Sequence, residues 1–171
     1  EYTNAAGQVV NGDQAIWFAM LKDGVTNFSS ATYQGAGKFL TGKFVFMMFG
    51  LPAAALAMYQ EAKPANKKLV GGILFSAALT SFLTGITEPI EFTFLFVAPP
   101  LYVIHAILEG ISYGLMHFLN VAVGITFSRG IIDFTFFGLL QGMAKTSYQW
   151  ILILGPIYSI GYYFIFKFMI E

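Results

Sequence analysis

Five stretches of this chain contain no Asp, Glu, Lys or Arg, and their lengths restrict the possible fold more than any other feature. They are residues 44–60, 69–87, 92–108, 110–128 and 146–166. A helix that crosses a bilayer needs about 17–25 mostly apolar residues, and each stretch is at or near that length. We therefore predict an all-α integral membrane protein. The alternative is a soluble helical protein, which would need polar helix faces turned to water.

The composition agrees with a membrane protein and excludes several functions. Hydrophobic residues make up 57% of the 171 residues and charged residues only 11%, against about 25% in typical soluble domains. Nine basic residues balance nine acidic ones, so we expect no nucleic acid among the partners, since that interface needs a basic face. There is no Cys, which excludes thiolate metal sites and cysteine catalysis. We expect no cofactor and no metal.

Several of the apolar stretches are interrupted by Gly and Pro. The interruptions are Gly50-Leu51-Pro52, Pro99-Pro100 and Gly155-Pro156. Proline removes a helical hydrogen bond, and in lipid the freed carbonyl must find another partner. We therefore predict broken helices and re-entrant helical hairpins. Residues 39–60 form either a hairpin or a broken span, and residues 128–133 are the tip of another hairpin.

The chain divides into two parts. Residues 1–38 are polar and are predicted to form a loop with a short amphipathic helix at the membrane interface, around residues 16–21. Residues 39–171 are the membrane-embedded part. Within it, loop 61–68 holds three of the nine basic residues, and the excess of positive charge predicts a cytoplasmic location. The chain begins at Glu1 rather than Met, so we expect a fragment of a longer protein.

Two carboxylates, Glu88 and Glu91, stand between two uncharged stretches and are the candidate functional residues. Charge at bilayer depth is costly and usually faces a cavity or a partner. Proline is favoured at the first position of a helix. With Pro89 in that position, Glu88 is predicted to be the N-cap and Thr87 the residue before it. Helix N–H groups would then keep the carboxylate ionised as an acceptor for sugar hydroxyls. A simple capping motif near the headgroups and a cation site remain as alternatives.

The remaining polar residues give weaker signals. His105 and His117 are too far apart for a paired metal site and are each predicted to be single interior or interfacial residues. Arg129 and Asp133 are spaced to pair with each other. Glu109 is predicted to end a helix, and Lys43 is predicted to extend its amine toward the membrane surface.

One motif resembles that of a known family. It is Gly85-Ile86-Thr87-Glu88-Pro89-Ile90-Glu91-Phe92. It resembles the membrane-embedded IIC component of the bacterial phosphoenolpyruvate-dependent sugar phosphotransferase system (PTS), in the glucose, maltose and N-acetylglucosamine group. Further stretches with this resemblance are residues 1–7, 50–55, 62–64 with 67–68, 76–84, and 126–128 with 133–134.

The resemblance implies a function. Proteins of this family bind glucose, maltose or a related sugar, carry it inward and present a hydroxyl for phosphorylation by the phosphocysteine of the IIB domain. The role of the motif glutamate maps onto Glu88 as the catalytic residue, and Thr87, Glu88 and Glu91 would bind the substrate. Other implied partners are membrane lipid and a second copy of the chain. The implied location is the bacterial plasma membrane, with several spans.

The chain also departs from the family pattern. An upstream histidine and arginine segment of the sugar site, the first helices that form the dimer contact, and the IIB cysteine are all absent from this sequence. We therefore expect half a binding site, a homodimer formed through helices outside this chain, and no catalysis by this part alone. An ion-coupled sugar carrier without phosphorylation and a purely structural subunit remain as alternatives. The sequence leaves open on which side of the membrane Glu88 lies.

Overall fold

The centre of the molecule is one long helix that runs from Gly42 to Gln60. In the computed structural model, which describes residues 1–28 and 36–171, it consists of three consecutive parts: α2 (Gly42–Val45), the π-helical turn η2 (Phe46–Gly50) and α3 (Leu51–Gln60). The chain crosses residues 50–52 without reversing. The helix continues through these residues, with a π-helical turn that ends at Gly50, so the predicted hairpin and the predicted break are both wrong.

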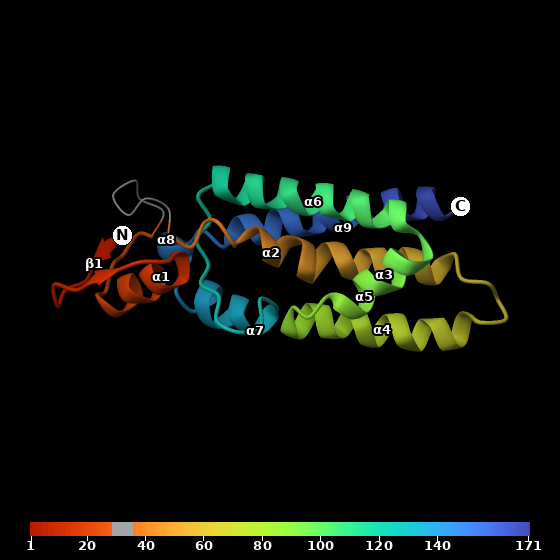
Figure 1. The fold of residues 1–171 in the computed structure, drawn as a ribbon, viewed down its shortest axis with the longest axis horizontal. Coiled ribbons are helices and arrows are strands. Elements are labelled where there is room, and N and C mark those ends of the chain that lie inside the picture. Colours follow the sequence, from red (N-terminus) through yellow and green to blue (C-terminus); the bar gives the residue numbers. More distant parts are fainter. Residues whose placement is uncertain (29–35) are drawn as a thin grey trace.

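The other helices surround this central one. They are α4 (Lys67–Thr84), α5 (Glu88–Val97), α6 (Pro99–Phe118), α7 (Ile131–Phe134) with the π-helical turn η3 (Thr135–Leu139), α8 (Met143–Thr146) and α9 (Gln149–Ile170). Helix α3 packs against α4 and α9, and α2 packs against α6. These long helices run along the long axis of the molecule (Figure 1), with α5 lying obliquely between α4 and α6.

The helix boundaries confirm some of the predicted spans and correct others. The break at Pro99-Pro100 is confirmed, because α5 ends at Val97 and α6 begins at Pro99. The break predicted at Gly155-Pro156 is wrong, because α9 runs through Pro156 without ending. The third and fourth uncharged stretches, however, are not two spans, since α6 runs through the charged residue between them. Within the described residues, two helices, Gly42–Gln60 and Gln149–Ile170, are both long enough and apolar enough to cross a membrane.

Two chain reversals meet beside the central helix. In the first, α4 ends at Thr84, Gly85 is its C-cap, and α5 begins at Glu88. In the second, an irregular segment, residues 121–130, turns into α7, and α7 contacts α4. Gly85 has a φ of 68°, and a Cβ on it would lie only 1.9 Å from the Ser128 carbonyl oxygen. The two tips therefore touch backbone to backbone, where no side chain fits.

The second tip is organised by the buried carboxylate of Asp133. It accepts hydrogen bonds from the backbone N–H groups of Thr126, Ser128 and Arg129 at 2.8, 3.1 and 3.2 Å, and from the Thr126 hydroxyl at 2.7 Å. These four hydrogen bonds compensate the free-energy cost of burying the Asp133 carboxylate. The predicted side-chain pair between Arg129 and Asp133 is wrong: in the part of the chain described, no ion pair joins them.

The amino-terminal part folds against one end of the helical bundle (Figure 1). It consists of a small hairpin of β1 (Tyr2–Thr3) and β2 (Val9–Val10), followed by α1 (Asp13–Lys22). Trp17 of α1 is fully buried, and its indole N–H donates to the Ala122 carbonyl at 2.9 Å. The predicted short helix is present. Its buried Trp17 packs on Ala122 and Gly124 in the irregular segment of the second reversal.

This packing makes Trp17 the main anchor of the amino-terminal part. We expect Trp17→Ala to destabilise the protein by about 3–5 kcal/mol, since it removes a fully buried aromatic side chain. The matched control is Trp150→Ala, because Trp150 is 37% exposed. Thermal unfolding in detergent measures both. An equal loss of stability in the two variants would contradict the packing described for α1.

Candidate functional site

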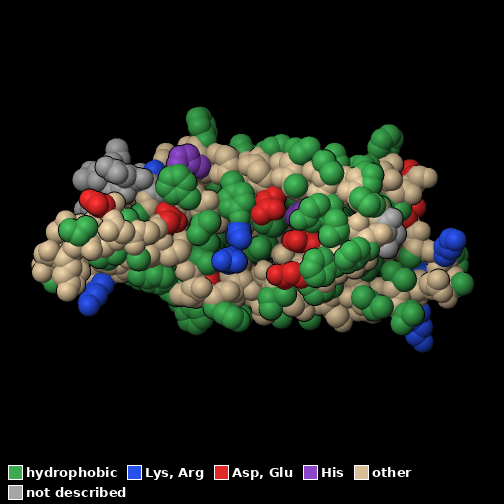
Figure 2. Space-filling view, in the orientation of Figure 1, with side chains coloured by type: hydrophobic (Ala, Val, Ile, Leu, Met, Phe, Trp, Pro, Cys, Tyr) green, Lys and Arg blue, Asp and Glu red, His purple; other side chains and the backbone are tan. Residues whose placement is uncertain are grey.

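Six titratable side chains gather where α2, α5, α6 and the second chain reversal meet. They are Lys43, Glu88, Glu91, His105, Glu109 and Arg129. The Lys43 ammonium interacts electrostatically with all three carboxylates and with the Arg129 guanidinium. Figure 2 shows acidic and basic side chains gathered in the middle of this face, with hydrophobic side chains around them and further charged side chains at the two ends of the molecule. Three carboxylates beside two cations and a histidine offset one another's charge, which an apolar setting requires.

The Thr87–Glu91 segment places two carboxylates at the start of α5. The helix begins at Glu88 and has Thr87 as its N-cap, so the predicted N-cap is wrong by one residue. The Thr87 carbonyl accepts the backbone N–H groups of Ile90 and Glu91, both at 3.0 Å. The buried Thr87 side chain also lies close to the Glu91 carboxylate. Pro89 in the first turn fits this local geometry, since it needs no N–H partner there.

The two glutamates have different surroundings. Glu88 is exposed at the first position of α5, whereas Glu91 is half-buried one turn further on. Both act on Lys43. The structure thus brings the three predicted site residues together, with Glu88 open to a ligand and Glu91 held by protein groups.

His105 is a member of this cluster that the sequence interpretation missed. Its ring is buried, with Nε2 at 3.6 Å from a Glu91 oxygen and 3.9 Å from a Glu109 oxygen. Its Nδ1 lies 3.0 Å from the Tyr162 hydroxyl of α9. The prediction that Glu109 ends a helix is wrong, because it lies in the middle of α6. The spacing of His105 and Glu109, one helical turn apart, was the available signal.

Lys43 belongs to the charged cluster, whereas His117 does not. Lys43 does not extend toward the membrane surface as predicted, since it is half-buried among the carboxylates. His117 is exposed at the end of α6, with its ring against Phe39 at a centroid distance of 5.1 Å. It is therefore no part of the cluster. In residues 1–28 and 36–171, no group of three His, Cys, Asp or Glu side chains is arranged to hold a metal ion.

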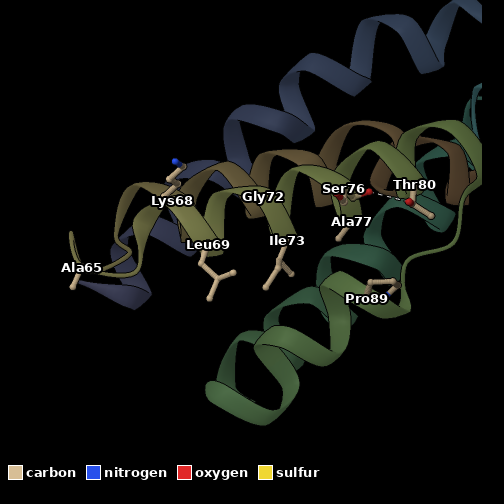
Figure 3. Close-up of a pocket in the computed structure, with 9 residues that line it drawn as sticks. All are labelled: Ala65, Lys68, Leu69, Gly72, Ile73, Ser76, Ala77, Thr80 and Pro89. Carbon is tan, nitrogen blue, oxygen red and sulfur yellow. Dashed lines mark hydrogen bonds between the residues drawn. The ribbon is translucent and has the colours of Figure 1, made fainter.

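An open cavity lies elsewhere, along α4. It has a volume of about 970 Å³ and is lined mainly by apolar groups. Figure 3 shows Leu69 and Ile73 of α4 pointing toward the space beside α5, with Pro89 at its far end. None of Thr87, Glu88 and Glu91 lines it. The charged cluster, rather than this cavity, is therefore the candidate functional site.

The fold and the cluster together define a helical membrane protein with ionisable groups inside its apolar region, as transporters have. Residues 2–110 match the family described as "Phosphotransferase system, EIIC". The match covers more than half of the chain and includes every residue of the cluster except Arg129. The chain belongs to this family. It is an all-α integral membrane protein and a component of a PTS sugar transporter.

Proposed function

We propose that this chain is the sugar-carrying part of a PTS transporter for glucose or maltose, with several spans in the bacterial plasma membrane. In this proposal Glu88 is the catalytic residue, and Thr87 and Glu91 bind the sugar with it. The supporting observation is the convergence of Thr87, Glu88 and Glu91 beside Lys43, at a chain reversal within the apolar part of the molecule.

The chemistry of the cluster suits a sugar hydroxyl. Ionised carboxylates accept hydrogen bonds, and the cations donate them. The Arg129 Nε is buried and has no hydrogen-bond acceptor among the described residues, so it can donate to a ligand oxygen. Lys43, which interacts electrostatically with Glu88 and Glu91, offers a second charged donor.

The proposed reaction transfers a phosphoryl group from the IIB phosphocysteine to the sugar. The hydroxyl oxygen forms a bond to phosphorus as the sulfur–phosphorus bond breaks, and the cysteine leaves as a thiolate. The exposed Glu88 carboxylate accepts the hydroxyl proton. Lys43 and Arg129 lie near the glutamates and would stabilise the negative charge of the phosphoryl group during its transfer.

Further parts of the proposal concern partners outside this chain. The phosphorylated IIB domain supplies the phosphoryl group, and upstream residues complete the sugar site. A homodimer forms through upstream helices, and lipid surrounds the exposed apolar side chains such as Phe75, Phe96 and Phe164.

Chemical analysis of the transported sugar tests this proposal. Cells that express the intact transporter should accumulate radiolabelled sugar as its phosphate, and only when phosphoenolpyruvate and the general PTS proteins are supplied. Unmodified sugar accumulated under a proton or sodium gradient would contradict the proposal and favour an ion-coupled carrier. Competition between glucose and maltose in the same assay identifies the preferred substrate.

A further inference from the structure

We infer that His105, oriented by the Tyr162 hydroxyl, is a positioning residue that holds Glu91 in place for sugar binding. This inference rests on the proposed function. It adds α9 to the site, since Tyr162 lies in the last helix, outside the segment that matches the family.

The contacts of the His105 ring fix where its proton lies. Nε2 faces the carboxylates of Glu91 and Glu109 at 3.6 and 3.9 Å. Carboxylates only accept hydrogen bonds, so the proton belongs on Nε2. In the neutral ring, Nδ1 is then the acceptor for the Tyr162 O–H at 3.0 Å. The hydroxyl thereby selects the ring form that presents a proton to Glu91.

Aromatic packing fixes the plane of the same ring. The rings of Phe46 and Phe94 meet His105 edge-on, at centroid distances of 5.7 and 5.5 Å. Both phenylalanines are buried, as is Tyr162. These side chains keep water away from the side of the imidazole that touches Tyr162. The other ring nitrogen, Nε2, points toward the half-buried Glu91. A ring held at both nitrogens and on its faces is suited to orienting a partner.

The role of His105 is separable from that of Glu88. Glu91 is placed by the first turn of α5, so loss of the His105 contact leaves the glutamate present but less constrained. We expect weaker sugar binding with little change in the transfer step, which depends on Glu88. The measured signature is a raised KM with kcat nearly unchanged.

Two variants and two matched controls test this inference in the intact transporter. Tyr162→Phe removes only the hydroxyl, and His105→Asn removes the ring. The controls are Tyr158→Phe, whose hydroxyl donates to the Leu108 carbonyl at 3.4 Å, and His117→Asn at the exposed end of α6. We measure sugar Kd, KM and kcat for phosphorylation, and thermal unfolding. Tyr162→Phe and His105→Asn should raise Kd and KM by about 10-fold, an effect of the size seen when an orienting partner is removed, while kcat and the controls stay within about twofold.

A double-mutant cycle shows whether His105 acts through Glu91. If it does, His105→Asn should add almost no further loss of affinity in a Glu91→Gln background. An unchanged Kd in both Tyr162→Phe and His105→Asn would overturn the inference, as would full additivity with Glu91→Gln. If His105→Asn does not fold, Tyr162→Phe decides the question, because it keeps the aromatic packing. Failure of the wild-type transporter to phosphorylate sugar would instead contradict the proposed function.

Discussion

Glu88→Gln is expected to lower the phosphorylation rate of the intact transporter by about 10²–10⁴-fold, the range for loss of a general base. The amide keeps the size of the side chain but cannot accept the hydroxyl proton. Because Glu88 is exposed and begins α5, the substitution leaves no buried group without a partner, and folding should be preserved. The measurement is transfer of labelled phosphate from the IIB domain to sugar, beside equilibrium sugar binding.

Glu61→Gln is the matched control for this prediction. Glu61 is a carboxylate in the loop that ends α3, and it lies 4.0 Å from Lys167, away from the charged cluster. We expect Glu61→Gln to phosphorylate sugar at a rate within about twofold of the wild-type rate, since surface ion pairs contribute little to stability. Phosphorylation by Glu88→Gln at the rate of this control would remove Glu88 from the catalytic role.

Gly85→Ala is expected to lower the stability strongly. Its φ of 68° is unfavourable for alanine, and the new Cβ would lie 1.9 Å from the Ser128 carbonyl oxygen and 2.8 Å from the Arg129 carbonyl carbon. These neighbours are backbone atoms, so the two chain reversals must separate to admit a methyl group. We expect a loss on the order of 3 kcal/mol or more, within the upper range for single substitutions. Thermal unfolding and the yield of monodisperse protein in detergent measure it.

Gly72→Ala provides the control within α4. A Cβ at this position meets nothing within 4 Å, and alanine favours a helix interior over glycine by about 1 kcal/mol. This variant should be as stable as the parent or more so. Equal stability of Gly85→Ala and Gly72→Ala would show that the two tips do not meet as described.

The sequence predicted best those features that depend on local composition. The apolar stretches around residues 44–60 and 146–166 became helices of spanning length, and Pro99-Pro100 ended one helix and began another. Proline acts on its own turn and the one before it, but it does not always end a helix, since α9 continues through Pro156. The prediction that residues 121–128 belong to a span was wrong for the converse reason. Val121, Ala122, Val123 and Ile125 are buried, but in an irregular segment that packs against other parts of the chain.

The site was predicted only in part, because half of it is made by tertiary contacts. Thr87, Glu88 and Glu91 are neighbours in sequence and could be found together. His105 meets Tyr162 across 57 residues, and no periodicity predicts that approach. Glu109 was misread because a charge between two apolar stretches is usually a boundary, whereas here it faces a histidine inside α6.

The π-helical turn in the central helix has a mechanical consequence. Such a turn disturbs the regular ladder of main-chain hydrogen bonds, and here hydroxyls from neighbouring helices supply extra bonds. The Ser81 hydroxyl of α4 donates to the Met47 carbonyl at 2.6 Å, and the Ser159 hydroxyl of α9 donates to the Phe49 carbonyl at 2.9 Å. A hydroxyl can follow a carbonyl through a change of angle by rotating about one bond. The central helix thus contains a hinge at its π-helical turn. The two halves of the helix can bend there while the Met47 and Phe49 carbonyls keep their hydrogen bonds to the serine hydroxyls.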